Sequence, residues 1–435
     1  MRDGLIIDCF AGGGGASTGI EAALGRKVDI AINHDPEAIR MHKVNHPDTL
    51  HLTEDIFEID LKKHVDNRHV MLMWASPDCT QFSKAKGGKP RASGIRMLPW
   101  AVYKHAKAIK PDLIIMENVE EIQQWGPLDD EGHPIKEKIG QEYQKFMAAM
   151  KSLGYACETR ELIAADFGAP TTRKRWYAIF RNDDQPIVWP VQTHSKNGGG
   201  LFGLKKWVSC GDLVDWSDLG KSIFDRKKPL AEKTQRRIAN GIKKFVVDNP
   251  DRYIVKDEKA SAFMIQYHSE SKGCDCRGQS LSEPIKTLDT SNRYGLVTAF
   301  ITKFYKNGVG QSLDDPIHTI TTSQGHFGLV SAFLIKYYGH GIGQGAGDPI
   351  GTITTVDRFG LVTVQIDGET YAISDIFLRM LKPEELKVMQ GFPANYVIDH
   401  DFEGRPYPKK EQVAKIGNSV VPLMAELLVK SNCRK

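Results

Sequence analysis

The chain has 435 residues, of which 41% are hydrophobic and 26% charged, and a formal net charge of +4. This length allows two or three domains with a sizeable core, and the lack of any run of 18 apolar residues excludes a transmembrane helix. The net charge is too small to indicate a nucleic-acid partner by itself. Seven widely spaced cysteines are untypical of a disulfide framework, and no signal peptide precedes the apolar residues 5–7, so we expect a cytoplasmic protein.

Residues 5 to about 185 alternate short apolar runs with amphipathic stretches. The apolar runs predict strands over 5–8, 28–33, 70–75, 113–117, 155–162 and 176–181. The stretches between them predict helices over 17–24, 37–45, 99–109 and 141–152. Such alternation is typical of a parallel, doubly wound α/β sheet, so we expect a Rossmann-like fold.

A glycine-rich turn, residues 10–15, separates the first predicted strand from its helix. Glycines at this place let the backbone approach a ligand closely, and Phe10 could lie on an adenine or methionine moiety. Ser17 or Thr18 is predicted to cap the helix, with Glu21 completing a capping box. The turn alone is compatible with a dinucleotide, with S-adenosylmethionine or with a plain loop.

Reactive side chains follow the ends of later strands. Ligands of open α/β sheets lie beyond the carboxyl ends of the strands, so Cys79 could act as a thiolate nucleophile, although a lone cysteine is more often inert core. Glu117 ends the next strand and could donate a proton near the same edge, or merely cap a helix. Arg173 and Arg175 alternate along an extended segment, which suits gripping an acceptor oxygen or a phosphate.

Two basic segments could contact a phosphate backbone. The first follows Cys79, has no acidic residue and contains Ser83, Lys84, Lys86, Lys89, Arg91 and Arg96. Its glycines make it a candidate lid over DNA. The second contains Arg226, Lys227, Lys228, Lys233, Arg236, Arg237, Lys243 and Lys244, and is equally compatible with a solvated helix face.

The middle of the chain carries an internal repeat. Prolines and a glycine run near 186–200 predict a domain boundary. Beyond it three units of about 33 residues recur at about 261–297, 298–330 and 331–362. Their similar segments are the heads 261–267, 298–304 and 331–337 and the tails 283–288, 315–320 and 348–353. We predict short β strands that brace one another, present their turns to a ligand, or do both.

Helical periodicity returns from about residue 371, with helices predicted over 383–390 and 412–429. This segment is similar in character to residues 1–185. Cys274, Cys276 and His268 form only a weak metal-binding pattern, so no metal site is expected.

Six segments, in this order, resemble motifs of the DNA cytosine-5 methyltransferase family. Residues 8–21 are similar to its S-adenosylmethionine loop, 77–83 to its nucleophile motif, 117–119 to its acidic motif and 166–177 to its arginine motif; 379–393 and 417–422 resemble its last two. The resemblance implies a catalytic domain over 1–185, a target-recognition domain over 186–370, and a C-terminal segment over 371–435 that returns to the catalytic domain.

The resemblance also implies an activity, the transfer of a methyl group from S-adenosylmethionine to C5 of a cytosine flipped out of double-stranded DNA. Cys79 would add to C6, Glu117 would bind N3 and the exocyclic amine, Arg175 would hold O2, and Arg173 would support the site. Asp55 would reach the adenine amine. The implied cofactor positions are Asp8, Phe10, Ala11, Gly12, Gly13, Gly14, Asn33, His34, Asp35, Asp55, Ile56, Pro77, Asn418 and Val420.

We further expect S-adenosylhomocysteine as product and no metal. The protein is expected to be monomeric, of bacterial or phage origin, cytoplasmic and associated with the nucleoid, with or without a partner restriction endonuclease. Three other functions stay open. They are a tRNA cytosine-5 methyltransferase, which the long middle segment disfavours, a catalytically weak DNA-binding paralogue and, more distantly, a dehydrogenase.

Three positions depart from the family pattern. Asp78 stands where proline usually precedes the cysteine, and a neighbouring carboxylate tends to raise a thiol pKa. The strand that should end in an acidic ribose ligand leads into residues 33–35, so Asn33 or Asp35 must serve. Thr171 replaces a glutamine of the arginine motif. None of these changes removes a catalytic group, so an active enzyme is expected.

Overall fold

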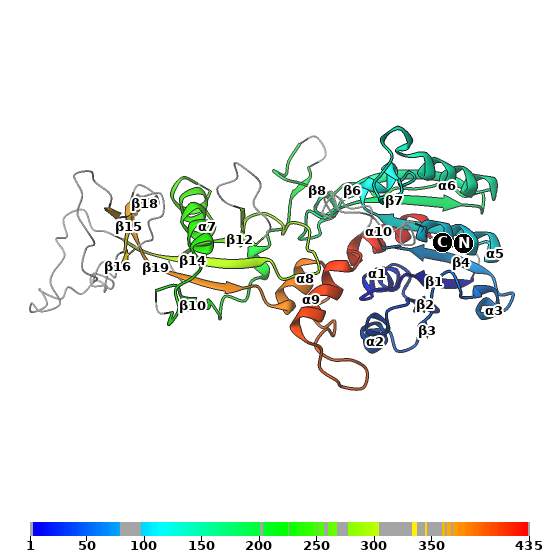
Figure 1. Ribbon diagram of the computed structural model, residues 1–435, viewed down its shortest axis with the longest axis horizontal. Coiled ribbons are helices and arrows are strands. Elements are labelled where there is room, and N and C mark those ends of the chain that lie inside the picture. The colour runs from blue at the N-terminus through cyan, green and yellow to red at the C-terminus, as the bar shows by residue number, and fades with distance from the viewer. Residues whose placement is uncertain are drawn as a thin grey trace, which may run out of the picture. The chain divides into compact units, whose positions relative to one another are not determined.

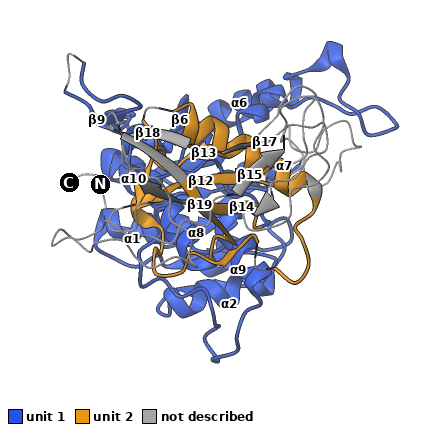
Figure 2. Ribbon diagram, turned by 90° about the vertical axis from the view of Figure 1, so that its left-hand side faces the viewer, with its two compact units in different colours: residues 1–210, 284–291, 383–435 blue, residues 211–283, 292–382 orange. Residues whose placement is uncertain are grey.

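The computed structural model describes residues 3–78, 97–200, 203–224, 226–249, 251–255, 260–267, 277–303 and 369–433, and short strand pieces within 333–366. The chain forms two compact units, which Figure 2 colours separately. Unit 1 contains residues 1–210, 284–291 and 383–435, and unit 2 contains residues 211–283 and 292–382. Within the described residues, no helix is long and apolar enough to cross a membrane.

Unit 1 is built on a seven-stranded sheet in the order β3-β2-β1-β4-β5-β7-β6 (Figure 1). Its strands are β1 (Leu5–Cys9), β2 (Ile30–Ile32), β3 (Leu50–Leu52), β4 (Val70–Ala75), β5 (Leu113–Asn118), β6 (Ala156–Ile163) and β7 (Lys174–Arg181). β1 to β5 are parallel, as predicted, whereas β7 runs antiparallel to both β5 and β6. Residues 164–173, which join β6 to β7, are too few for the helical crossover that a parallel pair needs.

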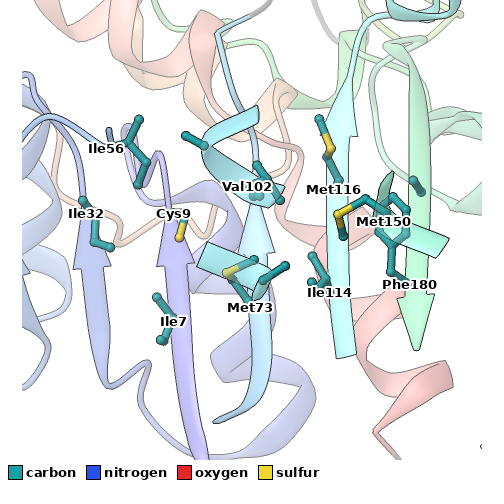
Figure 3. Close-up of a cluster of buried hydrophobic side chains, with 14 of the residues drawn as sticks. Ile7, Cys9, Ile32, Ile56, Met73, Val102, Ile114, Met116, Met150 and Phe180 are labelled. Atoms are coloured by element: carbon teal, nitrogen blue, oxygen red, sulfur yellow. The ribbon is translucent and has the colours of Figure 1, made fainter. Parts of the chain in front are cut away.

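Helices cover both faces of this sheet. Successive strand residues point to opposite sides, so apolar strands present hydrophobic side chains on both faces. Ile7 and Cys9 of β1 lie in a cluster with residues of α5 (Leu98–Ile109) and α6 (Gln141–Ser152), part of which Figure 3 shows. Ile6 lies in a second cluster with residues of α1 (Gly15–Leu24) and α10 (Pro422–Asn432). The remaining unit 1 helices are α2 (Pro36–Asn45), α3 (Leu61–Val65), α8 (Pro383–Met389) and α9 (Lys409–Asn418).

Two predicted helix boundaries are wrong. α1 begins at Gly15, after Gly14 in the left-handed conformation, and no side chain caps it. Ser17 therefore lies inside the helix, and Glu21 bonds His46 rather than completing a capping box. The helix predicted over 412–429 is two helices, α9 and α10, separated by residues 419–421. Val421 is extended because Pro422 follows it, and a proline disfavours helical geometry in the preceding residue.

Unit 2 contains an antiparallel sheet in the order β10-β19-β14-β12-β11, with β13 beside β12 and β18 beside β19. Its strands are β10 (Lys221–Ser222), β11 (Ile254–Val255), β12 (Ala260–Gln266), β13 (Gly278–Ser280), β14 (Tyr294–Lys303), β18 (Thr363–Ile366) and β19 (Glu369–Met380). α7 (Glu232–Ile242) buries Ile238 and Ile242 in a cluster with Phe263 and Val297 from this sheet. A smaller sheet contains β15 (Phe333–Lys336), β16 (Gln344–Gly345) and β17 (Phe359–Leu361).

The repeated heads of the sequence lie in β12, β14 and β15. β12 and β14 are antiparallel neighbours, with Ala262 opposite Thr298, whereas β15 belongs to the smaller sheet. The second and third tails, 315–320 and 348–353, lie outside the described residues. In the part of unit 2 that is described, the repeated heads are thus strands, and a repeating unit of structure stays a prediction.

The unit boundaries differ from the predicted 185/186 and 370/371. Residues 186–210 stay with unit 1, where Trp189 is buried and its Nε1 donates to Glu158 at 2.8 Å. Residues 284–291, from the first repeat, also belong to unit 1, because Thr172 N donates to Ile285 O at 2.8 Å. Residues 371–382 belong to unit 2, because β19 pairs with β14 along its length.

Candidate functional site

The glycine turn is held by the C-terminal segment of unit 1. A Cβ on Gly15 would lie 2.0 Å from Val420 O, and one on Gly14 would lie 2.0 Å from Tyr396 Oη. Such distances are impossible for real side chains, so both glycines are required for packing. Gly13 is less tightly packed, since a Cβ there would lie 2.7 Å from Ser419 Oγ and 3.0 Å from Lys415 O, and its carbonyl accepts a hydrogen bond from Tyr396 Oη at 2.8 Å.

Gly12 is the glycine of the turn that leaves room for a ligand. Among the described residues, a Cβ there would meet only Phe10 O, at 4.0 Å. Phe10 has a left-handed φ of 66°, which is unusual for an aromatic residue and costs strain that functional turns often carry. Ala11, which is buried, donates its N–H to Ile32 O at 2.9 Å and so anchors the turn to β2.

Asp8, at the end of β1, is completely buried. Ser17 Oγ donates to its Oδ2 at 2.7 Å, whereas its Oδ1 has no hydrogen-bond partner among the described residues. Burial raises the pKa of Asp8 to about 7, and the Ser17 hydrogen bond opposes that rise. A buried oxygen left without a donor beside an open glycine fits a site that a ligand or an ordered water completes.

The residues that follow β2 make different contacts. Asp35 caps α2 by accepting from Glu37 N at 2.9 Å, and it also forms an ion pair with Lys415 of α9. Burial works against ionisation of Asp35, but the hydrogen bond and charge of Lys415 outweigh it and lower the pKa. Asn33 Oδ1 accepts from Asp35 N at 2.8 Å, and His34 is exposed. The Asp35 carboxylate is thus already engaged by Glu37 N and by Lys415.

Other predicted cofactor positions lie at the ends of unit 1 elements. Asp55 is exposed, and its Oδ1 accepts from Phe57 N at 2.7 Å. Ile56 is buried, and His105 Nε2 donates to its carbonyl at 2.7 Å. Asn418 is the exposed last residue of α9. Val420 is buried against α1 and α10.

Glu117 and Arg175 form an ion pair at the carboxyl edge of the sheet. Arg175 Nε lies 3.0 Å from Glu117 Oε1, and the two side chains are only 11% and 10% exposed. They meet because β7 runs antiparallel beside β5, with Tyr177 opposite Glu117. The pair therefore offers carboxylate oxygens and guanidinium N–H groups side by side in a mostly desolvated place.

Arg173 has different partners from Arg175. Its Nη1 donates to Leu288 O at 3.2 Å and to Gly417 O at 3.0 Å, and the residue is buried. It thus ties the inserted segment 284–291 and the end of α9 to the start of β7. The sequence treats the two arginines as a pair, but the structure gives them separate contacts.

The predicted nucleophile lies beyond the described part of this edge. Cys79 is outside the described residues, as are Ser83, Lys84, Lys86, Lys89, Arg91 and Arg96. The segment that leads to Cys79 is held next to Glu117, because Asn118 Nδ2 donates to Pro77 O at 3.0 Å. Asp78, the last residue described before Cys79, is exposed.

Sequence reasoning missed several residues around the glycine turn. Tyr396 bonds Gly13 O, Lys415 pairs with Asp35, His42 bonds Ser17 and His51 bonds His42, and no local pattern predicts these contacts. The partners come from segments that lie far apart along the chain, so their proximity depends on the fold.

A mainly parallel seven-stranded sheet with a glycine turn after β1 and polar groups at its carboxyl edge fits an S-adenosylmethionine-dependent methyltransferase fold. More narrowly, the chain belongs to the C-5 cytosine-specific DNA methylase family, whose model matches residues 5–433.

Individual relatives are more distant. The chain is 28% identical over 195 residues to Type II methyltransferase M1.HphI of Haemophilus parahaemolyticus, covering 44% of this chain and 49% of that protein. It is 27% identical over 220 residues to Type II methyltransferase M.AquIA of Picosynechococcus sp., covering 48% of this chain and 87% of that protein. The match thus spans about half the length of the first relative and most of the second.

Among solved structures, the methyltransferase EhMeth of Entamoeba histolytica is similar with a TM-score of 0.51 at 14% sequence identity, covering 100% of both chains. At this identity the likeness shows the fold alone.

Proposed function

We propose that this protein is a DNA cytosine C5-methyltransferase that acts through a covalent adduct of Cys79. The observation that carries the proposal is the Glu117–Arg175 ion pair, held at the edge where β4 leads to Cys79. β1, β4 and β5 are parallel, so their carboxyl ends place this pair at the same edge as the glycine turn. Nucleophile, base-binding groups and methyl donor would therefore meet at one edge.

The ion pair suits a cytosine ring. Cytosine presents an exocyclic amine that donates, and N3 and O2 that accept. One oxygen of the Glu117 side chain would accept from the amine, and the other, when the carboxyl group is protonated, would supply a proton to N3. The Arg175 guanidinium would donate to O2. These contacts bind the base by its pairing edge, which is free only when the base has left the duplex.

The chemistry follows from the low reactivity of C5. The Cys79 thiolate would form a bond to C6, N3 would take a proton from Glu117, and the ring would become an enamine whose C5 is nucleophilic. The substrate S-adenosylmethionine supplies the methyl group and departs as S-adenosylhomocysteine. A base then removes the C5 proton, the electron pair of that bond expels Cys79 as thiolate, and N3 returns its proton to Glu117. The product is 5-methylcytosine with the enzyme restored.

The methyl donor would lie against the glycine turn. The open position at Gly12, the strained Phe10 and the unpartnered Oδ1 of buried Asp8 support this placement. Asn33 would hold the ribose, and Asp55 with Ile56 would bind the adenine end. Val420 would close the pocket from the C-terminal segment.

DNA would also contact unit 2, which we propose as the target-recognition domain. α7 turns its apolar residues toward the sheet, while Lys233, Arg236, Lys243 and Lys244 at and just beyond this helix are exposed. Such a row of cations is suited to phosphate contacts. The printed names of the relatives favour a role in a Type II restriction-modification system.

Trapping on 5-fluorocytosine tests the proposal. Fluorine at C5 cannot leave as a proton does, so the enzyme should stay bound to random-sequence duplex DNA as an adduct that resists denaturation and requires S-adenosylmethionine. Cys79→Ser should abolish the adduct, whereas Cys157→Ser, at a half-buried cysteine of β6, should leave it intact. Glu117→Gln should slow its formation by about 10²–10⁴-fold.

The substrates separate the alternatives. An adduct with RNA but not with DNA would favour the tRNA enzyme. S-adenosylmethionine binding without an adduct on any cytosine-containing DNA would favour a binding paralogue and refute the proposed catalysis. Sequencing for 5-methylcytosine in cells that express the chain would then identify the recognition sequence.

A further inference from the structure

A chain of four polar side chains connects a half-buried histidine to the carboxylate at the end of β1. His51 Nε2 lies 2.9 Å from His42 Nδ1, and His42 Nε2 lies 2.9 Å from Ser17 Oγ. Ser17 Oγ then donates to Asp8 Oδ2 at 2.7 Å. Asp8, Ser17 and His42 are fully buried, and His51 is half-buried on β3.

The donors of this chain all point toward Asp8. The single proton of Ser17 Oγ is donated to Asp8, so Ser17 accepts from His42 Nε2. Burial, together with the charges that His46 and His51 would carry, lowers the pKa of His42 well below its usual value, so His42 is neutral and its Nδ1 accepts from His51. This order of donors ends on Asp8 Oδ2 as acceptor, and a hydrogen bond donated to a carboxyl oxygen favours the ionised form of the group.

The arrangement fits neither a nucleophilic triad nor a metal site. Ser17, not the histidine, occupies the middle position, and its hydroxyl is buried and already bonded to a carboxylate. Among the residues that the structure describes, no group of three or more His, Cys, Asp or Glu side chains could hold a metal ion. The chain therefore acts on the carboxylate at its inner end.

The other titratable groups described near the chain come from β1, α1, α2 and the loops that contain Lys27 and Tyr396. Cys9 follows Asp8 on β1, and burial followed by the Asp8 charge raises its pKa above its usual range, so it stays a thiol. Glu21 of α1 is bonded to His46 of α2 at 3.1 Å and to Lys27. The remaining groups near the chain are Lys43 and Tyr396. Among the described residues named here, no lysine or arginine is bonded to Asp8.

We propose that Ser17, His42 and His51 are positioning residues that keep the Asp8 carboxylate ionised and oriented beside the S-adenosylmethionine site, so that affinity for this cation follows the charge on Asp8. The inference rests on the proposed cofactor. S-adenosylmethionine carries a sulfonium charge that S-adenosylhomocysteine lacks, and an anion buried near it, where the effective dielectric constant is low, favours the cation.

The charge on Asp8 is finely balanced. Burial raises its pKa to about 7 and the Ser17 hydrogen bond counteracts the rise, so the group ionises close to neutral pH. A hydrogen bond to a charged group shifts such a balance by about one pH unit or more when it is removed. Loss of the chain should therefore shift the titration of Asp8 to higher pH.

Binding of both ligands across pH tests the inference. The dissociation constants of S-adenosylmethionine and S-adenosylhomocysteine are measured by calorimetry on the full chain from about pH 5.5 to about pH 9. In the wild type, affinity for S-adenosylmethionine should rise through about pH 7 more steeply than affinity for S-adenosylhomocysteine. Ser17→Ala should move that rise upward by about one pH unit or more, and Asp8→Asn should flatten it.

Conservative and matched variants separate positioning from general damage. His42→Gln, which keeps a donor toward Ser17, should retain the wild-type profile, whereas His42→Leu should shift it as Ser17→Ala does. Thr49→Val removes another buried hydroxyl, which donates to Val28 O at 2.9 Å, and should lower the melting temperature without moving the profile.

Two results would overturn this inference without affecting the proposed function. One is an unmoved profile in a folded Ser17→Ala protein, and the other is an equal loss of affinity for both ligands. If the wild type binds neither ligand at any pH, the proposed function fails and this inference fails with it.

Discussion

Packing of α10 on α1 makes Gly19 a sharp test of how the C-terminal segment is held. Gly19 is buried inside α1. A Cβ placed on it would lie 2.2 Å from Pro422 O and 2.7 Å from both Ala425 Cβ and Glu426 N, whereas ordinary contacts begin at 3.4 Å. Gly19→Ala therefore requires α10 to move away from α1 by about 1 Å.

Two opposite effects determine the stability of Gly19→Ala. Alanine is better than glycine inside a helix by about 1 kcal/mol. Overpacking costs about 1–3 kcal/mol, and we take the upper end because two of the three atoms are backbone atoms of a helix that cannot rotate away. The net expectation is a loss of about 2 kcal/mol, or roughly 4–8 °C in melting temperature for a unit of this size.

Urea and thermal unfolding followed by circular dichroism measure this difference. Ala22→Ser, at an exposed position of the same helix, is the matched control and should change stability by less than about 0.5 kcal/mol. Because helix propensity alone predicts that Gly19→Ala is more stable than wild type, a stabilised variant would refute the close packing of the two helices. Weaker S-adenosylmethionine binding should accompany the loss, because α10 follows Val420.

Three further predictions concern the glycine turn and its surroundings. Tyr396→Phe removes the hydrogen bond to Gly13 O and should cost about 1 kcal/mol in urea unfolding, an unchanged midpoint being the contrary result. Asp35→Ala removes the cap of α2 and the ion pair with Lys415, and should lower the free energy of unfolding by about 1–2 kcal/mol at neutral pH. The loss should be smaller in acid. The pKa of Asp35 is lower in the folded chain, so its contribution to stability is present above its unfolded pKa and is lost as pH falls through its folded pKa. Burial raises the pKa of Asp8 to about 7, so between about pH 4 and about pH 7 the folded chain keeps a proton that the unfolded chain has lost. The stability of the wild type therefore falls as pH rises through this range. The stability of Asp8→Asn relative to wild type should thus rise from about pH 4 to about pH 7 and then level off, and a difference independent of pH would contradict this.

Elements with a strong local pattern were predictable. The unbroken apolar run over 70–75 and the amphipathic period over 141–152 predicted the same bounds that the structure shows for β4 and α6. The break between α9 and α10 was also encoded locally, by Pro422, but the apolar face that continues through it concealed the boundary. The short β3 and α3, with three and five residues, lack the length for a clear period.

The roles of single residues were harder to predict than the elements that hold them. Glu117 and Arg175 were expected near one edge, but their direct contact depends on the antiparallel course of β7. Arg173, two residues away, turns instead to carbonyl groups from segments 284–291 and 383–435. Alternating positions in a strand show that two side chains lie on the same face. They do not show which group each side chain contacts.

The sequence by itself determined the longer strands and helices of unit 1, the glycine turn and the family motifs, because these depend on neighbours along the chain. Only the tertiary structure decided what the glycines are for. Gly13, Gly14 and Gly15 make room for residues near 396 and 415–420, and, as far as the described residues show, Gly12 alone of the four leaves space for a ligand. It also decided that Asp8 is buried at the end of a chain of donors from β3, α2 and α1. Contacts between segments so far apart arise from packing, which no local periodicity contains.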